Sequence, residues 1–571
     1  MRTKKKTFSK IKTRVAHGFA AVKKQGFLTG ALTLAVAGML CRVIGIAFRI
    51  PLANIVGNYG MGIYQMVFPL YALLLVVSSS GIPVAISKMV AKANTKDNTR
   101  AECKRILINA IVLLGIIGLI VSALLFGLAF PIAALQGNTA ATKIYFAIAP
   151  AIFLVCLISA IRGYFQGLSN MIPTATSQIV EQVTKVGAGL ALVLLLIPRG
   201  VEWAVFGAIL AVTISEFAAL TYLMILYFFH LKKQNKGKTA KLDLLSQSPT
   251  VPERPKQSKA TQKQNGFGDK KVNKFRSYIS RGLMWEIIKK SVPITLMAAL
   301  FPLILVFDSL VVIHLLQSGG ASNQVATQLY GISSGTVHTL INMPAVLGIA
   351  IGAAVVPMTA SLLQKKNKDA VRDKTLLAVK ISLILGLFFM LFYIAFSREI
   401  ITLLYERAFE GNTEQLRIAT NLLRIEAVMI LLMGLTQVFT SLLQGAGRAK
   451  FPLIGLAIGG AVKVTFSLVF IRTGMGIYAV SIGNVLCFGI ALALTAFFAL
   501  RFLETKWRFN WKWWRLLALT LAYSAVLVIL MLFLPSGKFW VLLAGATAAS
   551  AYAAGLLLLF RGDKRYREKK T

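Results

Sequence analysis

The chain has 571 residues, 57% of them hydrophobic, and a mean hydropathy of +0.71. A soluble domain is far less apolar, so this composition excludes a soluble globular protein and predicts one that lies in a membrane. The formal net charge of +43 arises from 63 Lys and Arg residues against 20 Asp and Glu residues. These bases gather in runs between apolar segments, which is typical of loops that contact anionic lipid headgroups, so we expect no nucleic-acid partner.

Long apolar segments fill most of the sequence. A helix that crosses a membrane needs about 20 apolar residues. By this measure the sequence predicts an all-α polytopic membrane protein with about 14 transmembrane helices. The expected helices are 27–53, 61–87, 106–130, 143–161, 175–197, 203–230, 287–316, 328–360, 376–397, 417–444, 452–471, 475–500, 515–534 and 538–560.

Composition also divides the chain along its length. The stretch 231–285 is rich in Lys, Gln and Ser and poor in apolar residues, which predicts a basic, disordered cytoplasmic linker between two halves. The predicted order is a basic cytoplasmic N-terminus (1–26), an N-terminal six-helix bundle (27–230), this linker, a C-terminal six-helix bundle (286–503), two extra helices (504–560) and a basic cytoplasmic tail (561–571).

The charge of the loops alternates along the chain. Loops after even-numbered helices carry Lys and Arg, as in 88–105, 365–374 and 501–515, whereas the loops between them are nearly uncharged or mixed. Cytoplasmic loops collect Lys and Arg. This alternation therefore predicts that both termini are cytoplasmic.

The two halves share a sequence pattern. Gln166-Gly167 follows the fourth expected helix and Gln444-Gly445 closes the tenth; Lys185 follows Gln166 at the same interval as Lys463 follows Gln444. Six is an even number of helices, so both halves enter the membrane in the same direction. The pattern predicts a pseudo-twofold axis along the membrane normal, with a central cleft between the two bundles.

Several stretches carry a family resemblance, and they are Cys41-Arg42-Val43-Ile44-Gly45, Gly62-Ile63-Tyr64-Gln65, Ser80-Gly81-Ile82-Pro83 and Arg162-Gly163-Tyr164-Phe165-Gln166-Gly167. They resemble the polysaccharide-exporter branch of the multidrug/oligosaccharidyl-lipid/polysaccharide (MOP) superfamily, and within it the Gram-positive lipid II flippases and the stage V sporulation protein B group. The resemblance implies a bacterial plasma-membrane protein with fourteen helices, alternating access and an undecaprenyl-pyrophosphate-linked sugar as cargo. Gram-negative lipid II flippases carry an Asp and an Arg in the second helix, where this chain has Tyr64 and then apolar residues, so those roles are not carried over.

Two arginines lie well inside the first apolar segment, where charge persists only beside water or a partner. Arg42 and Arg49 are two helical turns apart and therefore share one face of the helix. Arginine offers a planar, permanently charged fork for phosphate oxygens, so we expect both to bind a pyrophosphate group. The alternative is a buried structural ion pair, for instance with Glu181.

Four further cations extend this prediction. Lys185 and Lys463 hold matching positions in the two halves, and both are expected to face the cleft. Lys88 and Arg162 end their helices at the cytoplasmic side. They are expected either to form an entry funnel for the anionic headgroup or to contact lipid headgroups.

Membrane acids are the expected sites for a coupling proton or sodium ion. Asp308, deep in the seventh expected helix, is the best candidate, followed by Glu181 and Glu216. Glu181 and Lys185 are four residues apart on one helix, so mutual neutralisation is an open alternative. Glu426, nearer the outer end, is expected to be a structural or rim residue.

These observations predict a transporter rather than an enzyme. The leading hypothesis is a flippase for undecaprenyl-pyrophosphate-linked saccharide, most of all lipid II, with partners in the cell-wall synthesis machinery. We expect no cofactor and no metal, because the cysteines show no ligand spacing. The sequence has no GxxxxGK[ST] motif, so the driving force is expected to be an ion gradient, the membrane potential or consumption of product.

Two other functions stay open. A drug or cation antiporter of the same superfamily would favour a net acidic cleft, whereas the N-terminal half is basic. A membrane glycosyltransferase or polymerase that acts on a lipid-linked glycan would need acids displayed in outer loops, for which Glu406, Glu410 and Glu414 are available.

Overall fold

The computed structural model describes residues 2–79, 81–94, 99–246 and 279–503, with short stretches between 518 and 552. These residues are almost wholly helical and include no β-strand, so the all-α prediction is confirmed. Eleven of the described helices are long and apolar enough to cross a membrane. The chain is therefore a multi-pass membrane protein.

The described helices follow chain order as α1 (Arg2–Ser79), α2 (Gly81–Ala93), α3 (Thr99–Gly127), α4 (Ala129–Leu135), α5 (Ala141–Gly167), α6 (Ile172–Leu196), the short η1 (Ile197–Arg199), α7 (Val201–Ser246), α9 (Arg281–Ser318), α10 (Asn323–Tyr330), the π-helix η2 (Gly331–Val337), α11 (His338–Gln364), α12 (Lys368–Ala395), α13 (Ser397–Tyr405), η3 (Arg407–Phe409), α14 (Thr413–Gly445), α15 (Lys450–Phe470), η4 (Ile471–Met475) and α16 (Tyr478–Leu503).

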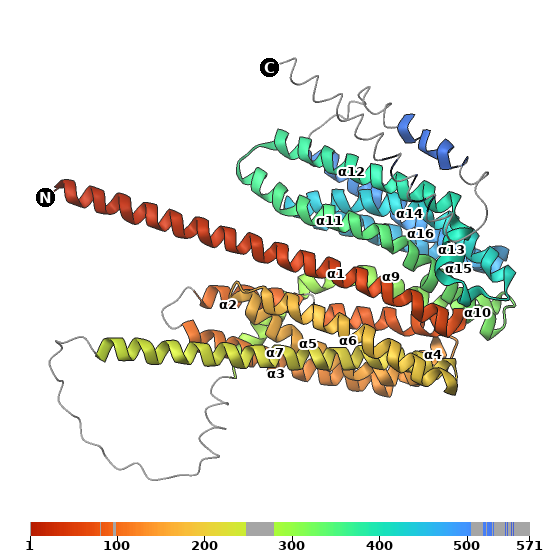
Figure 1. The fold of residues 1–571 in the computed structure, drawn as a ribbon, viewed down its shortest axis with the longest axis horizontal. Coiled ribbons are helices and arrows are strands. Elements are labelled where there is room, and N and C mark those ends of the chain that lie inside the picture. The colour runs from red at the N-terminus through yellow and green to blue at the C-terminus, as the bar shows by residue number, and fades with distance from the viewer. Residues whose placement is uncertain are drawn as a thin grey trace, which may run out of the picture.

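α1 folds back on itself at Gly57. The backbone there has φ +66° and ψ −176°, a conformation that glycine adopts without strain. In a straight helix Arg49 and Phe68 would lie roughly 28 Å apart. Instead the Arg49 guanidinium lies 5.1 Å from the centre of the Phe68 ring. The two arms of α1 are therefore antiparallel, and they correspond to the first two predicted helices (Figure 1).

The predicted helix count is only partly tested. Because Val36–Ala93 holds two predicted helices, the eleven membrane candidates contain the twelve that the sequence predicts up to residue 503. The last two, 515–534 and 538–560, lie largely outside the described residues. The predicted linker is partly helical, since α7 continues to Ser246 and α9 begins at Arg281, while 247–278 lie outside the described residues.

The helices gather in two groups, with α1–α7 in one and α11–α16 in the other (Figure 1). α9 contacts α1 and α2 on one side and α15 on the other. Side chains cap two helices of the second group at their starts: Asn367 accepts a hydrogen bond from the Ala370 amide at α12, and Asn412 accepts one from the Gln415 amide at α14.

We name the two ends of the molecule by their connections. The basic end is where α11 connects to α12 and α14 connects to α15; the neutral end is where α1 reverses at Gly57 and α13 leads into α14. Figure 1 shows the two groups meeting at the neutral end and diverging toward the basic end. By the loop charges, the basic end is the predicted cytoplasmic side.

Amide side chains join the groups at the neutral end. Asn54 Nδ2 donates to the Leu404 carbonyl at 2.7 Å. Asn58 Nδ2 donates to the Ala408 carbonyl at 3.0 Å and to Gln415 Oε1 at 2.8 Å. We call these contacts of Asn54 and Asn58 the latch. They keep the neutral end closed in this structure.

Glycines let the backbones touch beside the latch. A Cβ on Gly62 would lie 2.1 Å from the Thr327 carbonyl oxygen, and one on Gly331 would lie 2.1 Å from the Asn58 carbonyl oxygen. No side chain fits either position without movement of the backbone. The closed neutral end is therefore a tight contact between α1 and the α10–η2 segment.

Candidate functional site: a cationic cavity between the bundles

A cavity of about 430 Å³ lies between the two groups of helices. One wall comes from α1 and α6, and the other comes from α11, α14 and α16. The residues that α1 contributes include Cys41, Arg42, Gly45 and Arg49, whose spacing places them on one face of the helix. The cavity is thus built by helices from both halves of the sequence.

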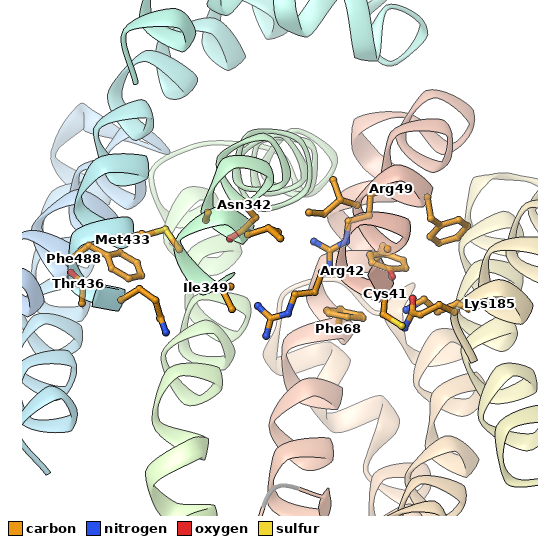
Figure 2. Close-up of a pocket in the computed structure, with 18 residues that line it drawn as sticks. Cys41, Arg42, Arg49, Phe68, Lys185, Asn342, Ile349, Met433, Thr436 and Phe488 are labelled. Carbon is orange, nitrogen blue, oxygen red and sulfur yellow. The ribbon is translucent and has the colours of Figure 1, made fainter. Parts of the chain in front are cut away.

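The wall from the N-terminal half carries three cations. Arg42 and Arg49 on α1 and Lys185 on α6 all line the cavity. Figure 2 shows Arg42 and Arg49 extending from α1 toward α11. The Arg49 guanidinium is held over the Phe68 ring, a cation–π contact that fixes its direction. The structure brings together these three residues of the predicted binding set; their role in binding stays a prediction.

The opposite wall carries no charged residue and is mixed: three of its side chains are polar and the others are apolar. Asn342 on α11 and Thr436 and Gln437 on α14 provide hydrogen-bonding groups, with apolar Met433 and Phe488 beside them (Figure 2). Sequence reasoning missed this wall. Its only signal was that Thr436 and Gln437 follow the apolar run 427–435 of α14, which also fits ordinary intrahelical bonding.

The charged residues that line the cavity are all positive, and none of the lining residues is acidic. Cations that are partly removed from water attract an anion more strongly than cations in bulk solvent do. The geometry therefore suits an anionic group against the α1–α6 wall and a neutral group against the α11–α14 wall, where three side chains can form hydrogen bonds.

Arg162 and Glu181 form an ion pair outside the cavity lining. Arg162 Nη2 lies 3.0 Å from Glu181 Oε2, and Arg162 Nε donates to Ser177 Oγ at 3.0 Å. Glu181 is thus paired with Arg162, and no ion pair within the described residues joins it to Lys185, which lines the cavity. Lys88 is exposed on α2, and its predicted role at an entry funnel stays a prediction.

Lys463 takes a position different from that of Lys185. It is 2% exposed, lies away from the cavity lining and forms a buried ion pair with Asp308 on α9. Gly483 on α16 makes room for it, since a Cβ there would lie 3.2 Å from Lys463 Cγ. The expectation that both lysines face the cleft is therefore wrong for Lys463, because a carboxylate from another helix holds it.

Replacing Lys463 with methionine is expected to destabilise the protein by about 3–5 kcal/mol, since Asp308 would be left charged and unpaired in the interior. The melting temperature of the purified protein in detergent checks this. The double substitution Asp308→Asn with Lys463→Met is expected to recover much of the loss. A single Lys463→Met variant that melts like the unaltered protein would contradict the assignment.

The two remaining buried acids differ in their surroundings. Glu216 on α7 is 3% exposed, and its Oε1 accepts a hydrogen bond from the Tyr71 hydroxyl at 3.2 Å. Glu426 on α14 is fully buried and accepts from Ser481 Oγ at 2.7 Å and from Asn484 Nδ2 at 3.1 Å. Glu426 is therefore an internal residue that joins α14 to α16, not a rim residue.

Two helical bundles that enclose a cationic cavity and meet at one end are the architecture expected of a transporter. The comparisons with known proteins agree. Residues 27–250 match the family model described as "Polysaccharide biosynthesis protein", and residues 293–469 match the MatE model. The two matches fall on opposite sides of the undescribed segment, one in each half of the chain.

Relatives and solved structures point the same way. The chain is 28% identical over 467 residues to stage V sporulation protein B of Bacillus subtilis, covering 81% of each chain. It is 24% identical to lipid II flippase MurJ of the same organism, over 78% of this chain and 77% of that one. A structure of lipid II flippase MurJ in an inward closed conformation matches with a TM-score of 0.64 and 15% identity, over 93% of this chain and 99% of that chain.

An inward-facing multidrug resistance transporter of the MATE family also matches, with a TM-score of 0.60 and 14% identity, over 83% of this chain and 98% of that chain. At such identities the structural matches establish the fold. Taken with the family models and the curated relatives, they show that the chain is similar to the membrane transporters and flippases of the MOP superfamily, lipid II flippase MurJ among them.

Proposed function

We propose that the protein is a flippase that moves a polyprenyl-pyrophosphate-linked saccharide, most of all lipid II, from the inner to the outer leaflet. The observation that carries this proposal is the cavity in which Arg42, Arg49 and Lys185 face an uncharged, largely apolar wall with three hydrogen-bonding side chains. A pyrophosphate needs several cationic donors, and sugars need neutral hydrogen-bonding groups. The similarity to lipid II flippase MurJ supports the same choice of cargo.

Transport then follows the geometry of the cavity. The pyrophosphate enters from the basic end and binds the guanidinium groups of Arg42 and Arg49, while its sugars contact the Asn342 and Gln437 side. The polyprenyl tail stays in the lipid, because moving it out of the bilayer would gain no hydrophobic free energy. Rocking of the two bundles opens the latch and exposes the cavity at the neutral end.

A cation or drug antiporter is the second function, since the MATE relatives share the fold. A cationic substrate in this cavity would meet Arg42, Arg49 and Lys185 with no acid in the lining to offset them. Like charges a few ångströms apart repel, so the cavity chemistry favours the anionic cargo.

We infer that Glu216 is the site of any coupling proton or sodium ion. Of the three acids predicted for this role, Asp308 is paired with Lys463 and Glu181 with Arg162. Glu216 forms no ion pair within the part of the chain that the structure describes, and the hydroxyl of Tyr71 is its hydrogen-bond partner. A buried carboxylate that has no cationic partner in the protein can bind a proton or a sodium ion.

The test uses the full-length protein in liposomes that contain fluorescent lipid II, with a membrane-impermeant quencher added outside. The protein is expected to raise the fraction of lipid II that the quencher reaches over time, and a lipid with the same tail but a neutral headgroup is expected not to move. Equal movement of both lipids, or none of either, would refute the proposal. Efflux of an organic cation from the same liposomes would favour the antiporter.

A further inference from the structure

A second pocket lies at the neutral end of the C-terminal bundle, far along α14 from the central cavity. Its volume is about 560 Å³, and α13 and the first turns of α14 form it. Arg398 on α13 and Arg417 and Arg424 on α14 line it and are all exposed. The other lining residues are one acid, Glu414, and Thr413, Leu416, Thr420 and Asn421.

The arginines of this pocket are not neutralised by acids. Within the described residues, no ion pair joins Arg398, Arg417 or Arg424 to a carboxylate, and Glu414 is the single acid in the lining. Arg424 Nε donates to Oγ of the buried Ser397 at 3.2 Å, which orients its guanidinium while its two NH₂ groups make no hydrogen bond to a described residue. Because three arginines and only one acid line this pocket, its electrostatic potential is strongly positive.

The fold does not require these charges. α5 is the counterpart of α14, because both end in a Gln-Gly pair. The position in α5 that matches Arg424 is Phe146, whose ring lies 4.6 Å from that of Phe126. The same place in the first bundle thus holds a pair of exposed aromatic rings. The helix does not need an arginine at this position in order to fold, so Arg424 calls for another explanation.

The pocket also lies at the depth of lipid headgroups. α14 has 33 residues and is therefore roughly 50 Å long, against a hydrocarbon layer of about 30 Å. If the two ends share the excess of roughly 20 Å, about the first two turns of α14 lie outside the hydrocarbon. Arg417 and Arg424 stand on one face of α14, with Thr413, Thr420 and Asn421, and form a polar stripe that leads from the surface toward the bilayer.

We propose that this pocket binds the phosphate groups of a lipid in the leaflet at the neutral end. Guanidinium groups bind phosphate through paired hydrogen bonds, and three of them match the oxygens of a phosphodiester or a pyrophosphate. Under the proposed function, on which this reading of the ligand rests, the site would receive the pyrophosphate headgroup after it has crossed. The pocket thus assigns a second anion site to the C-terminal bundle.

The experiment measures bound lipid by native mass spectrometry of the full-length protein. The test variant is Arg398→Gln with Arg417→Gln, since neither side chain makes a hydrogen bond to a described residue and folding should be unaffected. The control is Arg199→Gln with Arg472→Gln, two exposed arginines at the same end but outside the pocket. All proteins carry Arg42→Gln and Arg49→Gln so that the central cavity contributes little. The probes are phosphatidylglycerol, undecaprenyl pyrophosphate, diacylglycerol and inorganic pyrophosphate.

The test variant is expected to bind phosphatidylglycerol and undecaprenyl pyrophosphate at least about tenfold less than the control, with no difference for diacylglycerol. Binding of inorganic pyrophosphate as tight as that of the lipids would keep the phosphate site but assign it to a free anion. Equal lipid binding by both variants would overturn the proposal. A further outcome separates the two proposals. If the test variant binds lipid more weakly than the control but the unaltered protein does not transport lipid II, the proposed function is rejected and the phosphate site in this pocket is kept.

Discussion

Replacing Arg49 with alanine is expected to lower lipid II transport about 10- to 100-fold at subsaturating substrate. A hydrogen bond to a charged group contributes about 1.5–3 kcal/mol, and each 1.4 kcal/mol is a factor of about ten in affinity. Arg49 both lines the cavity and is fixed over Phe68, so its loss removes an oriented donor. Initial transport rates in the lipid II liposome assay measure the effect.

Two further variants serve as controls for the Arg49→Ala result. Arg49→Lys keeps the charge but loses the planar fork, so it is expected to fall between alanine and the unaltered protein. Arg199→Ala removes an exposed arginine outside the cavity and is expected to change nothing. An Arg49→Ala variant that transports normally, at the same level in the membrane, would remove the cavity cations from the mechanism.

Joining the latch covalently is expected to stop transport altogether. Asn58→Cys and Gln415→Cys place two thiols where the Asn58 and Gln415 side chains are hydrogen-bonded at 2.8 Å. In a chain without its four native cysteines, a short reversible thiol crosslinker would hold the bundles together at the neutral end. Transport is expected to fall to background after crosslinking and to return after reduction.

A second crosslink provides the control for the first. Lys143 and Glu202 lie 3.0 Å apart at the same end, but both belong to the first bundle. Crosslinking Lys143→Cys to Glu202→Cys is therefore expected to leave transport intact. If the latch crosslink is complete and transport continues, the bundles do not separate at the neutral end and alternating access by this route is wrong.

Features that depend on one helix were predictable from the sequence. Hydropathy alone located the helices up to residue 503, because each helix must by itself be long enough to cross the hydrocarbon layer of the bilayer. The shared face of Arg42 and Arg49 follows from helical spacing, and the structure places both at one cavity.

Features that depend on pairs of helices were not predictable in the same way. The sequence repeat suggested equal roles for Lys185 and Lys463, but Asp308 from α9 reaches only the second. The acidic and basic residues between 406 and 417 suggest a loop of little net charge. Folding nevertheless brings Arg417 beside Arg398 and Arg424 in one pocket. Spacing along one helix does not reveal which carboxylate a neighbouring helix will supply.

The reversal of α1 at a single glycine has a mechanical consequence. Arg49 and Asn54 both lie on the first arm of α1, before Gly57 and within about two helical turns of each other. A helix is stiff over this length, so a tilt that brings Arg49 closer to an anion also pulls Asn54 away from the Leu404 carbonyl or presses it against that carbonyl. Binding of an anion at Arg49 and the state of the latch are therefore expected to be coupled through this one arm of α1.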